Sequence, residues 1–464
     1  MSAASNKRWR SALVIGSGIG GLLAARVLAD AFDAVTVIER DAEPGDASPR
    51  HGAQQGFHPH GLLTRGEAIM ERLFPGFAQA LTSMGAVSMD PGREVEVASG
   101  PDRGVAFDTP FRTLSMTRGL LELCLRRFAA SVPNITIRYG VDADRLILGP
   151  DGKATGVAVR AGERDEVIEA DLIVDAGGRA AQATKWLAAH SFPTPPETSI
   201  GLDFGYATAL FDIPPDFDGS WRLMYLLPRP PKETVGLAAF EVEGKRWMVG
   251  IAGRGSGRPT ADPDAFVPFA ARHPDKRLHD WLSRARRVSD VKTYRFAAAA
   301  RRHFEKLDRH PENFIAFGDA LCSLNPVYGQ GMSVAAMEAE ALMDLLRQRQ
   351  TLDGLWRAFY ARAAALTDLP WTMALELDMQ FDETKVARPA LYPLQRRILG
   401  WASGVIMSDP ALRAKVFARI NLMATPADEI GIGEVLKAQW RQWATPSRPA
   451  VVATRAEQQP AKSI

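Results

Sequence analysis

Gly16, Gly18 and Gly21 in "GSGIGG" have the spacing GxGxxG, and Glu39 ends the next apolar run. Gly16 permits a tight turn, Gly18 lets the backbone approach a pyrophosphate, and Gly21 lets a helix pack on the preceding strand. The start of that helix presents its partial positive charge to the phosphates. Glu39 is placed to accept hydrogen bonds from a ribose. The pattern predicts a dinucleotide but does not choose between NAD and FAD, and Arg40 leaves a ribose 2′-phosphate open.

A second group with chemical potential is "FGDALCSLNPVYGQGM". Asp319 follows an apolar strand predicted at 314–317, at the carboxyl end where open α/β sheets bind ligands. Gly329 and Gly331 allow a close approach, and the helix that follows offers free N–H groups to an electron-rich partner. The aspartate suits a polyol, and the helix start suits a ring that becomes anionic. A flavin has both parts, in its ribityl chain and its ring. The combination therefore favours FAD over a nicotinamide.

These motifs and "DLIVDAGGR" resemble those of the FAD-dependent monooxygenases of the p-hydroxybenzoate hydroxylase superfamily. Within it, "QQGFHPHGLLTRGEAIMERLFPG" and "PWTMALELDMQFDET" are similar to bacterial FAD-dependent epoxidases and hydroxylases of polyketide or isoprenoid intermediates. The resemblance spans roughly residues 10 to 440. It implies cofactor contacts at Gly16, Gly18, Gly20, Gly21, Glu39, Arg40, Arg118, Asp319, Pro326, Gly329, Gly331 and Met332.

The activity that the resemblance implies is insertion of one oxygen atom from O2 into an apolar aromatic or olefinic small molecule, by hydroxylation or epoxidation. Reduced flavin would form a C4a-hydroperoxide, and NAD(P)H would supply the electrons. One departure concerns Gly177, Gly178 and Arg179, where many relatives have Asp-Gly, while Asp175 stands two positions early. A separate flavin reductase is therefore an alternative to direct reduction by NAD(P)H.

Three other functions remain open from the sequence. An FAD-dependent reductase of isoprenoid double bonds shares the fold and the "VDAGGR" stretch. A flavin-dependent halogenase is also similar, but its WxWxIP motif is absent, since no Trp-x-Trp occurs in this chain. A non-catalytic flavin-binding protein is the alternative from a different class, and the fold alone does not exclude it.

His51, His58 and His60 lie close together in "HGAQQGFHPHGLL". Their spacing, the intervening proline and the lack of a nearby carboxylate or cysteine set argue against a metal site. The resemblance places this loop near the flavin ring, so His58 or His60 could orient substrate or exchange a proton, with loop capping as the alternative. Tyr328, in the flavin loop, is a third catalytic candidate.

Four β-like runs between the flavin motifs, "FGYATALFDIP", "SWRLMYLLP", "TVGLAAFEVEG" and "RWMVGIAG", predict an antiparallel sheet that walls the substrate site. Bulky residues on it and in the histidine loop would form an apolar pocket, although strand aromatics are more often ordinary core. The predicted pocket residues are Phe57, Tyr206, Trp221, Met224, Tyr225, Phe240 and Met248.

The elements that must position these groups predict an α/β fold. We expect a Rossmann-like FAD-binding domain, with a parallel sheet and an inserted β-meander, plus an antiparallel β-sheet substrate domain and a helical C-terminal region. The expected boundaries are 1–190 and 301–350 for the two parts of the FAD-binding domain, 191–300 for the substrate domain, 351–440 for the helical region and 441–464 for a disordered tail.

Composition limits the function classes. The 464 residues include 56 Lys and Arg against 54 Asp and Glu, so the net charge of +2 gives no footprint for nucleic acid. Two cysteines exclude a disulfide scaffold and indicate a reducing compartment, and no run is apolar enough to span a membrane. We expect a cytoplasmic protein, with membrane-surface contact through amphipathic C-terminal helices left open.

Overall fold

The computed structural model describes residues 7–47 and 54–444. Within them, a five-stranded parallel sheet has the order β17-β11-β1-β2-β7. Residues 12–15 of its strand β1 are an apolar run with a paired strand on each side, whereas Arg10, near the start of β1, is exposed. The strands of this parallel sheet are β1 (Trp9–Ile15), β2 (Phe32–Glu39), β7 (Ile135–Tyr139), β11 (Leu172–Asp175) and β17 (Phe314–Ala316).

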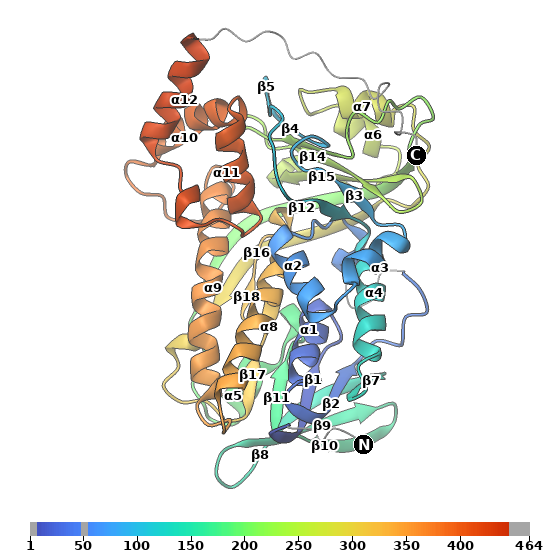
Figure 1. The fold of residues 1–464 in the computed structure, drawn as a ribbon, viewed down its shortest axis with the longest axis vertical. Coiled ribbons are helices and arrows are strands. Elements are labelled where there is room, and N and C mark those ends of the chain that lie inside the picture. The colour runs from blue at the N-terminus through green and yellow to red at the C-terminus, as the bar shows by residue number, and fades with distance from the viewer. Residues whose placement is uncertain (1–6, 48–53, 445–464) are drawn as a thin grey trace, which may run out of the picture.

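Helices cover one face of the parallel sheet, and a β-meander covers the other (Figure 1). Helix α1 packs against α4 and α8, and α8 packs in turn against α2 and α9. The helices are α1 (Ile19–Leu28), α2 (Thr64–Leu73), α3 (Phe77–Ser83), α4 (Arg118–Ala130), α5 (Ala183–Ala189), α8 (Gly331–Gln348) and α9 (Leu355–Asp378). The meander is β8 (Val141–Leu148), β9 (Ala154–Ala161) and β10 (Arg164–Glu169), and it confirms the predicted insertion.

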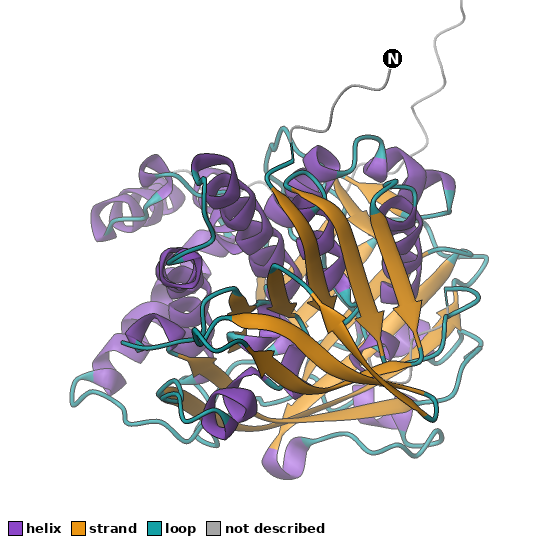
Figure 2. Cartoon of the chain, turned by 90° about the horizontal axis from the view of Figure 1, so that it is seen from below, coloured by secondary structure: helices purple, strands orange, loops and turns teal. Residues whose placement is uncertain are grey.

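A second large sheet, called here the mixed sheet, has the order β18-β16-β12-β15-β14-β13-β4-β5 in the described residues. Figure 2 shows its long strands side by side as a twisted surface. Its strands are β4 (Val95–Ser99), β5 (Asp102–Arg103), β12 (Glu197–Asp212), β13 (Leu223–Leu227), β14 (Gly236–Val242), β15 (Arg246–Arg254), β16 (Lys292–Arg302) and β18 (Cys322–Ser323). The four predicted runs are confirmed as β12 to β15, but the sheet also recruits β4, β5 and β18 from outside residues 191–300.

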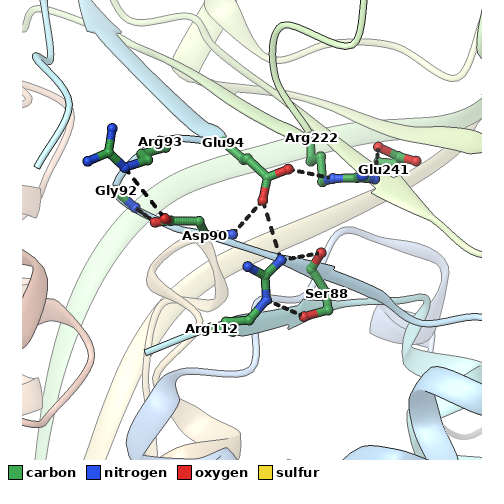
Figure 3. Close-up of polar contacts among 8 residues, drawn as sticks. All are labelled: Ser88, Asp90, Gly92, Arg93, Glu94, Arg112, Arg222 and Glu241. Atoms are coloured by element: carbon green, nitrogen blue, oxygen red, sulfur yellow. Dashed lines mark hydrogen bonds and ion pairs between the residues drawn. The ribbon is translucent and has the colours of Figure 1, made fainter. Parts of the chain in front are cut away.

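Charged side chains fasten the β4 edge of the mixed sheet (Figure 3). Glu94 accepts a hydrogen bond from Arg222 Nε at 2.9 Å and lies 3.5 Å from Arg112 Nη2. Arg222 Nη1 also donates to Glu241 Oε2 at 3.0 Å. These contacts join the loop after β3 (Val87–Met89) to β13 and β14, next to the small ladder that β3 forms with β6 (Thr113–Ser115).

The short helices α6 (Phe266–Ala270) and α7 (Arg277–Leu282) cover the outer face of the mixed sheet. Helices α10 (Tyr392–Met407), α11 (Pro410–Ile420) and α12 (Ile432–Ala444) lie together at one end of the molecule (Figure 1). Residues 441–444 are thus helical, contrary to the expected tail; the rest of that tail lies outside the described residues. Across residues 7–47 and 54–444, no helix is both long and apolar enough for a membrane span.

Candidate functional site

A cavity of about 620 Å³ lies at the carboxyl ends of the parallel strands. It extends from the turn between β1 and α1, past Arg118 and Asp319, to the start of α8. Among the predicted cofactor residues, those that line it are Gly16, Gly18, Gly20, Glu39, Arg40, Arg118, Asp319, Pro326, Gly329, Gly331 and Met332. Residues from three separated stretches of sequence therefore meet at one site.

Two glycines of the turn, Gly16 and Gly21, leave no room for a side chain. Gly16 has φ +95°, and a Cβ there would lie 2.7 Å from the carbonyl oxygen of Ala176. A Cβ on Gly21 would lie 1.8 Å from the carbonyl oxygen of Gly16, so Gly21 serves helix packing and not the cavity. Gly18 precedes α1, and no described side chain caps this helix. Its first N–H groups therefore remain available to an anion such as a pyrophosphate.

Glu39 is held in place at the end of β2. Its Oε2 accepts hydrogen bonds from the N–H and the hydroxyl of Ser17, both at 2.9 Å, and its Oε1 accepts one from the N–H of Asp41 at 3.2 Å. The carboxylate is buried yet lines the cavity. A carboxylate fixed in this way suits the hydroxyls of a ribose. Sequence reasoning missed the part played by Ser17, which is the second residue of the glycine motif.

The middle of the cavity pairs a cation with an acceptor. Arg118 Nε donates to Glu122 Oε1 at 2.8 Å, which fixes the guanidinium at the start of α4. Asp319 accepts no hydrogen bond from the described residues; burial raises the pKa of its carboxyl, and Arg118 and Arg179 lower it in part. A ligand hydroxyl would supply the missing donor, as the ribityl assignment requires.

The far end of the cavity is the start of α8. Gly329 has φ +66°, a left-handed conformation that favours glycine, and Gly331 and Met332 line the wall. Gln330 is buried, and its Oε1 has no hydrogen-bond partner among the described residues. No described side chain caps α8, so its first N–H groups remain free for an electron-rich ring. The free N–H groups, the open acceptor and the sterically restricted glycine turn all fit FAD.

Glu338, on the buried face of α8, was missed from the sequence. Its Oε2 accepts a hydrogen bond from the N–H of Gly318 at 2.7 Å, directly before Asp319. Burial raises the pKa of Glu338 to about 8; the bond from Gly318 lowers it, and Asp319 raises it further. This side chain therefore stays neutral at neutral pH. An acidic residue at an apolar position of the helical pattern was the available signal.

The histidine loop lies between the cavity and the mixed sheet. His58 Nδ1 is 2.8 Å from the hydroxyl of Thr208, and burial lowers the pKa of His58 to about 4. His60 lines the cavity, and burial and then the Arg118 charge lower its pKa to about 3. Both rings are neutral at neutral pH, which favours positioning over proton exchange. His51 lies outside the described residues, and no group able to hold a metal occurs in the described part of the chain.

Tyr328 belongs to a buried polar network behind the flavin loop. Its hydroxyl donates to Asp378 Oδ1 at 2.7 Å, and burial, followed by the Asp378 charge, raises the pKa of Tyr328 well above its usual value. Asp378 Oδ1 also accepts from Asn325 Nδ2 at 3.0 Å and pairs with Arg254. The tyrosine thus anchors the loop as a hydroxyl donor, and its phenol is a poor acid. Asp378 lies within "PWTMALELDMQFDET", so the resemblance pointed to this stretch without indicating its contact.

The mixed sheet separates the predicted pocket residues by face. The Tyr206 ring lies 4.4 Å from His58, and a Cβ on Gly61 would lie 3.9 Å from the Tyr225 hydroxyl, so both tyrosines face the histidine loop. The residues of the mixed sheet that line the cavity itself are Tyr294 and Phe296 of β16, which were missed from the sequence. Phe240 and Met248 pack in the cluster beside Tyr225.

Two of the predicted pocket residues lie elsewhere. Trp221 and Met224 are on the opposite face, where Trp221 stacks on Trp247 at 4.9 Å under α6 and α7. Their assignment to the pocket is wrong: the alternation of β13 turns Met224 to the outer face, and Trp221, in the segment before β13, packs into the same outer core. Phe57 belongs to the histidine loop, and the Lys292 ammonium lies 5.7 Å from the centre of its ring.

The departure at Gly177 also has a structural explanation. The buried Asp175 accepts hydrogen bonds from the N–H groups of Gly177 at 3.1 Å, and of Gln182 and Ala183 at 2.7 Å each. It orders the turn that follows β11 and is fully engaged there. Arg179 is exposed on that turn, lines the cavity and donates to the Tyr294 hydroxyl at 3.1 Å.

Comparison with known proteins agrees with this geometry. The family model described as "FAD binding domain" matches residues 10–351. Protein Rv3254 of Mycobacterium tuberculosis is 28% identical over 449 residues, which cover 93% of this chain and 94% of that protein.

Solved structures share the fold. The flavin-dependent brominase Bmp2 superposes with a TM-score of 0.66 at 15% identity, covering 93% of this chain and 98% of the brominase. The flavin-dependent halogenase CmlS gives a TM-score of 0.64 at 17% identity, over 94% of this chain and 77% of that one. PqsL of Pseudomonas aeruginosa, a probable FAD-dependent monooxygenase, gives 0.57 at 16% identity, over 80% and 94%.

The family match covers most of the chain and both halves of the cavity, and the fold is that of flavin-dependent monooxygenases and halogenases. These findings confirm the expected resemblance: the chain belongs to the FAD binding domain family and is an FAD-dependent oxidoreductase.

Proposed function

We propose that this protein is an FAD-dependent monooxygenase that inserts one oxygen atom into an apolar aromatic or olefinic small molecule, by hydroxylation or epoxidation. The observation that carries the proposal is the wall that the histidine loop and the mixed sheet form together beside the cavity. It combines apolar side chains of the mixed sheet, two neutral imidazoles and one buried hydroxyl that has no partner in the described residues.

The hydroxyl belongs to Tyr206. Its Oη is buried and unpartnered within the described part of the chain, and burial raises the pKa of Tyr206 above its usual value, so it remains a donor. Leaving such a group without a partner costs roughly 1–3 kcal/mol. An oxygen atom on a bound substrate would accept this hydrogen bond. The wall therefore suits a largely apolar molecule with a single acceptor group.

The chain's own residues would orient the substrate and exclude water from the site. When bound, FAD supplies the oxygen chemistry. The N–H groups at the start of α8 would stabilise negative charge on the ring, and the Tyr294 and Phe296 rings that line the cavity would exclude water from it. His58, held by Thr208, would orient the substrate as a neutral ring.

The electron donor is part of the same proposal. NAD(P)H would reduce the flavin directly or through a separate flavin reductase. The engagement of Asp175 with three backbone N–H groups supports the second route, since that carboxylate is not free for a nicotinamide. Rates of flavin reduction by NADH or NADPH, measured without air with and without an added reductase, separate the two routes.

The test uses FAD-loaded protein, a reducing system and a panel of apolar phenols and olefins. We expect a product that gains one oxygen atom. Tyr206→Phe should raise KM for that substrate by roughly tenfold, with little change in kcat. A product with a saturated double bond and no added oxygen would support the reductase alternative. Binding of FAD with no turnover across the panel would support the non-catalytic one.

A further inference from the structure

Helix α12 carries an apolar stripe that nothing covers in the described part of the chain. Ile432, Leu436, Trp440 and Trp443 recur at i, i+4, i+8 and i+11, so they lie along one side of the helix. Trp440 is 67% exposed and Trp443 is 76% exposed. Large indoles are rarely left this open on a soluble surface without a binding role.

The stripe is not the side by which α12 packs. Val435 and Ala438 on a different face bury against Val405 and Leu412. A helix that only completes a bundle needs one apolar face. Helix α12 has two, and the second is directed to solvent.

Helix α10 extends the apolar surface. Trp401 Nε1 donates to Gln439 Oε1 at 3.1 Å, which joins α10 to α12 next to the stripe. The two helices lie together at one end of the molecule (Figure 1). The exposed apolar residues at this end of α10 are Leu391, Leu394, Ile398, Leu399 and Trp401. We call these residues and the α12 stripe the α10–α12 face.

Positive charge is in excess in the described region that carries this face. Residues 388–444 contain eight Lys and Arg against four Asp and Glu, whereas the whole chain has a net charge of only +2. Three of these cations, Arg396, Lys415 and Arg441, form ion pairs. Lys437 and Arg397 are exposed on the same two helices as the apolar residues. A positively charged apolar face opposes pairing with a second copy of itself and favours an anionic partner that is apolar underneath.

We propose that the α10–α12 face binds the surface of an anionic lipid bilayer. The indoles and aliphatic side chains would enter the boundary between headgroups and acyl chains, where tryptophan is enriched, and Lys437 and Arg397 would contact lipid phosphates. This attachment does not depend on the flavin chemistry.

Helices α10, α11 and α12 form a bundle that also contacts the segment after the histidine loop. Asn421, just after α11, is buried, and its Oδ1 accepts from the N–H and the hydroxyl of Thr64, both at 3.1 Å. Thr64 begins α2, three residues after Gly61 of the histidine loop. The helical bundle that carries the α10–α12 face is thus fastened, through the residue after α11, to the segment that borders the cavity. If the proposed apolar substrate is correct, the bilayer would be its reservoir.

The experiment is co-sedimentation of the FAD-loaded full chain with vesicles of phosphatidylcholine alone or mixed with phosphatidylglycerol. Binding should require phosphatidylglycerol. Trp440→Ser/Trp443→Ser should weaken binding at least ~10-fold, and Arg397→Glu/Lys437→Glu about fivefold or more per charge. The control is Val167→Ser, an exposed apolar position on β10, which should bind as the unmodified protein does.

Absence of binding to anionic vesicles would overturn the proposal, as would binding that both double variants retain. Equal binding to both kinds of vesicle would also contradict it. If the unmodified protein instead forms an oligomer that Trp440→Ser/Trp443→Ser dissolves, the face is a protein interface and the proposal is wrong. Retained FAD and an unchanged circular dichroism spectrum establish that each variant is folded; should the tryptophan variant misfold, the charge variant decides.

Discussion

The two ends of the cavity are built in different ways. At the nucleotide end, backbone N–H groups, glycines and fixed carboxylates form the wall, and at Gly21 there is no space even for a methyl group. At the other end, side chains of the mixed sheet form it, with Tyr294 and Phe296 at alternate positions of β16. A wall of backbone groups depends on geometry that few substitutions preserve, whereas a wall of side chains can change one residue at a time. The first should therefore define the cofactor strictly and the second should adapt to a substrate.

The largest effect should come from the glycine turn. Gly21→Ala places a Cβ 1.8 Å from the carbonyl oxygen of Gly16, and the backbone must move. We expect the free energy of unfolding to fall by about 3 kcal/mol or more, with loss of bound FAD. The matched control is Gly20→Ala, whose Cβ would lie 3.6 Å from the Phe317 ring, an ordinary contact. Urea unfolding of the two apoproteins measures the difference, and equal stabilities would contradict the account.

The next effect is on cofactor affinity. Asp319→Asn replaces the carboxylate that should accept a hydrogen bond from a ribityl hydroxyl with a neutral amide. The Kd for FAD should therefore rise roughly tenfold to a hundredfold. Asp308→Asn, at an exposed position of the same region, is the control and should leave Kd unchanged. Titration of each apoprotein with FAD gives the values. An unchanged Kd for Asp319→Asn would remove the ribityl assignment.

Glu338 should make stability depend on pH. Its pKa rises from 4.5 to about 8 on folding, so the folded protein keeps a proton that the unfolded chain releases in this window. The stability that this group contributes is complete below pH 4.5 and is lost as the pH rises towards 8.

The matching variant is Glu338→Gln, which cannot release a proton. Relative to this variant, the unmodified protein should lose up to about 1.4 kcal/mol of unfolding free energy per pH unit between those values. Urea unfolding across the pH range provides the test. Parallel stability curves for the two proteins would show that Glu338 is charged in the folded state.

The smallest effect distinguishes the two faces of the mixed sheet. Tyr206→Phe should raise the free energy of unfolding slightly, by about 1 kcal/mol, because it removes an unpartnered buried hydroxyl, while weakening substrate binding. Trp221→Phe should instead lower the free energy of unfolding, because a smaller ring makes less contact with Trp247, and it should leave KM unchanged. Thermal unfolding and KM, measured for both variants, give opposite signatures if the faces are assigned correctly.

This contrast also explains what the sequence could predict. The cofactor motifs place their residues by local geometry, so spacing and flanking strands alone predicted Gly16, Glu39 and Asp319, and all three line the cavity. The fold followed from the same periodicities. Met224 was misplaced because the face to which a strand residue points depends on register, and β13 pairs with β4 from far earlier in the chain.

The contacts of Asp378 and Glu338 were hidden for a similar reason. Asp378 meets Tyr328 and Arg254 only through tertiary packing, and neither partner is near it in sequence. Glu338 accepts its hydrogen bond from Gly318, twenty positions earlier in the chain. Buried polar residues on otherwise apolar helix faces were the one visible sign.

The most direct measurement of the central claim is a single turnover with labelled oxygen. FAD-loaded protein would be reduced without air, mixed with a panel of apolar phenols and olefins, and exposed to dioxygen carrying the heavy isotope of oxygen. Mass spectrometry would then follow the products. The account predicts a product that contains one heavy oxygen atom. Recovery of all the electrons as hydrogen peroxide, or in a saturated double bond, would contradict it.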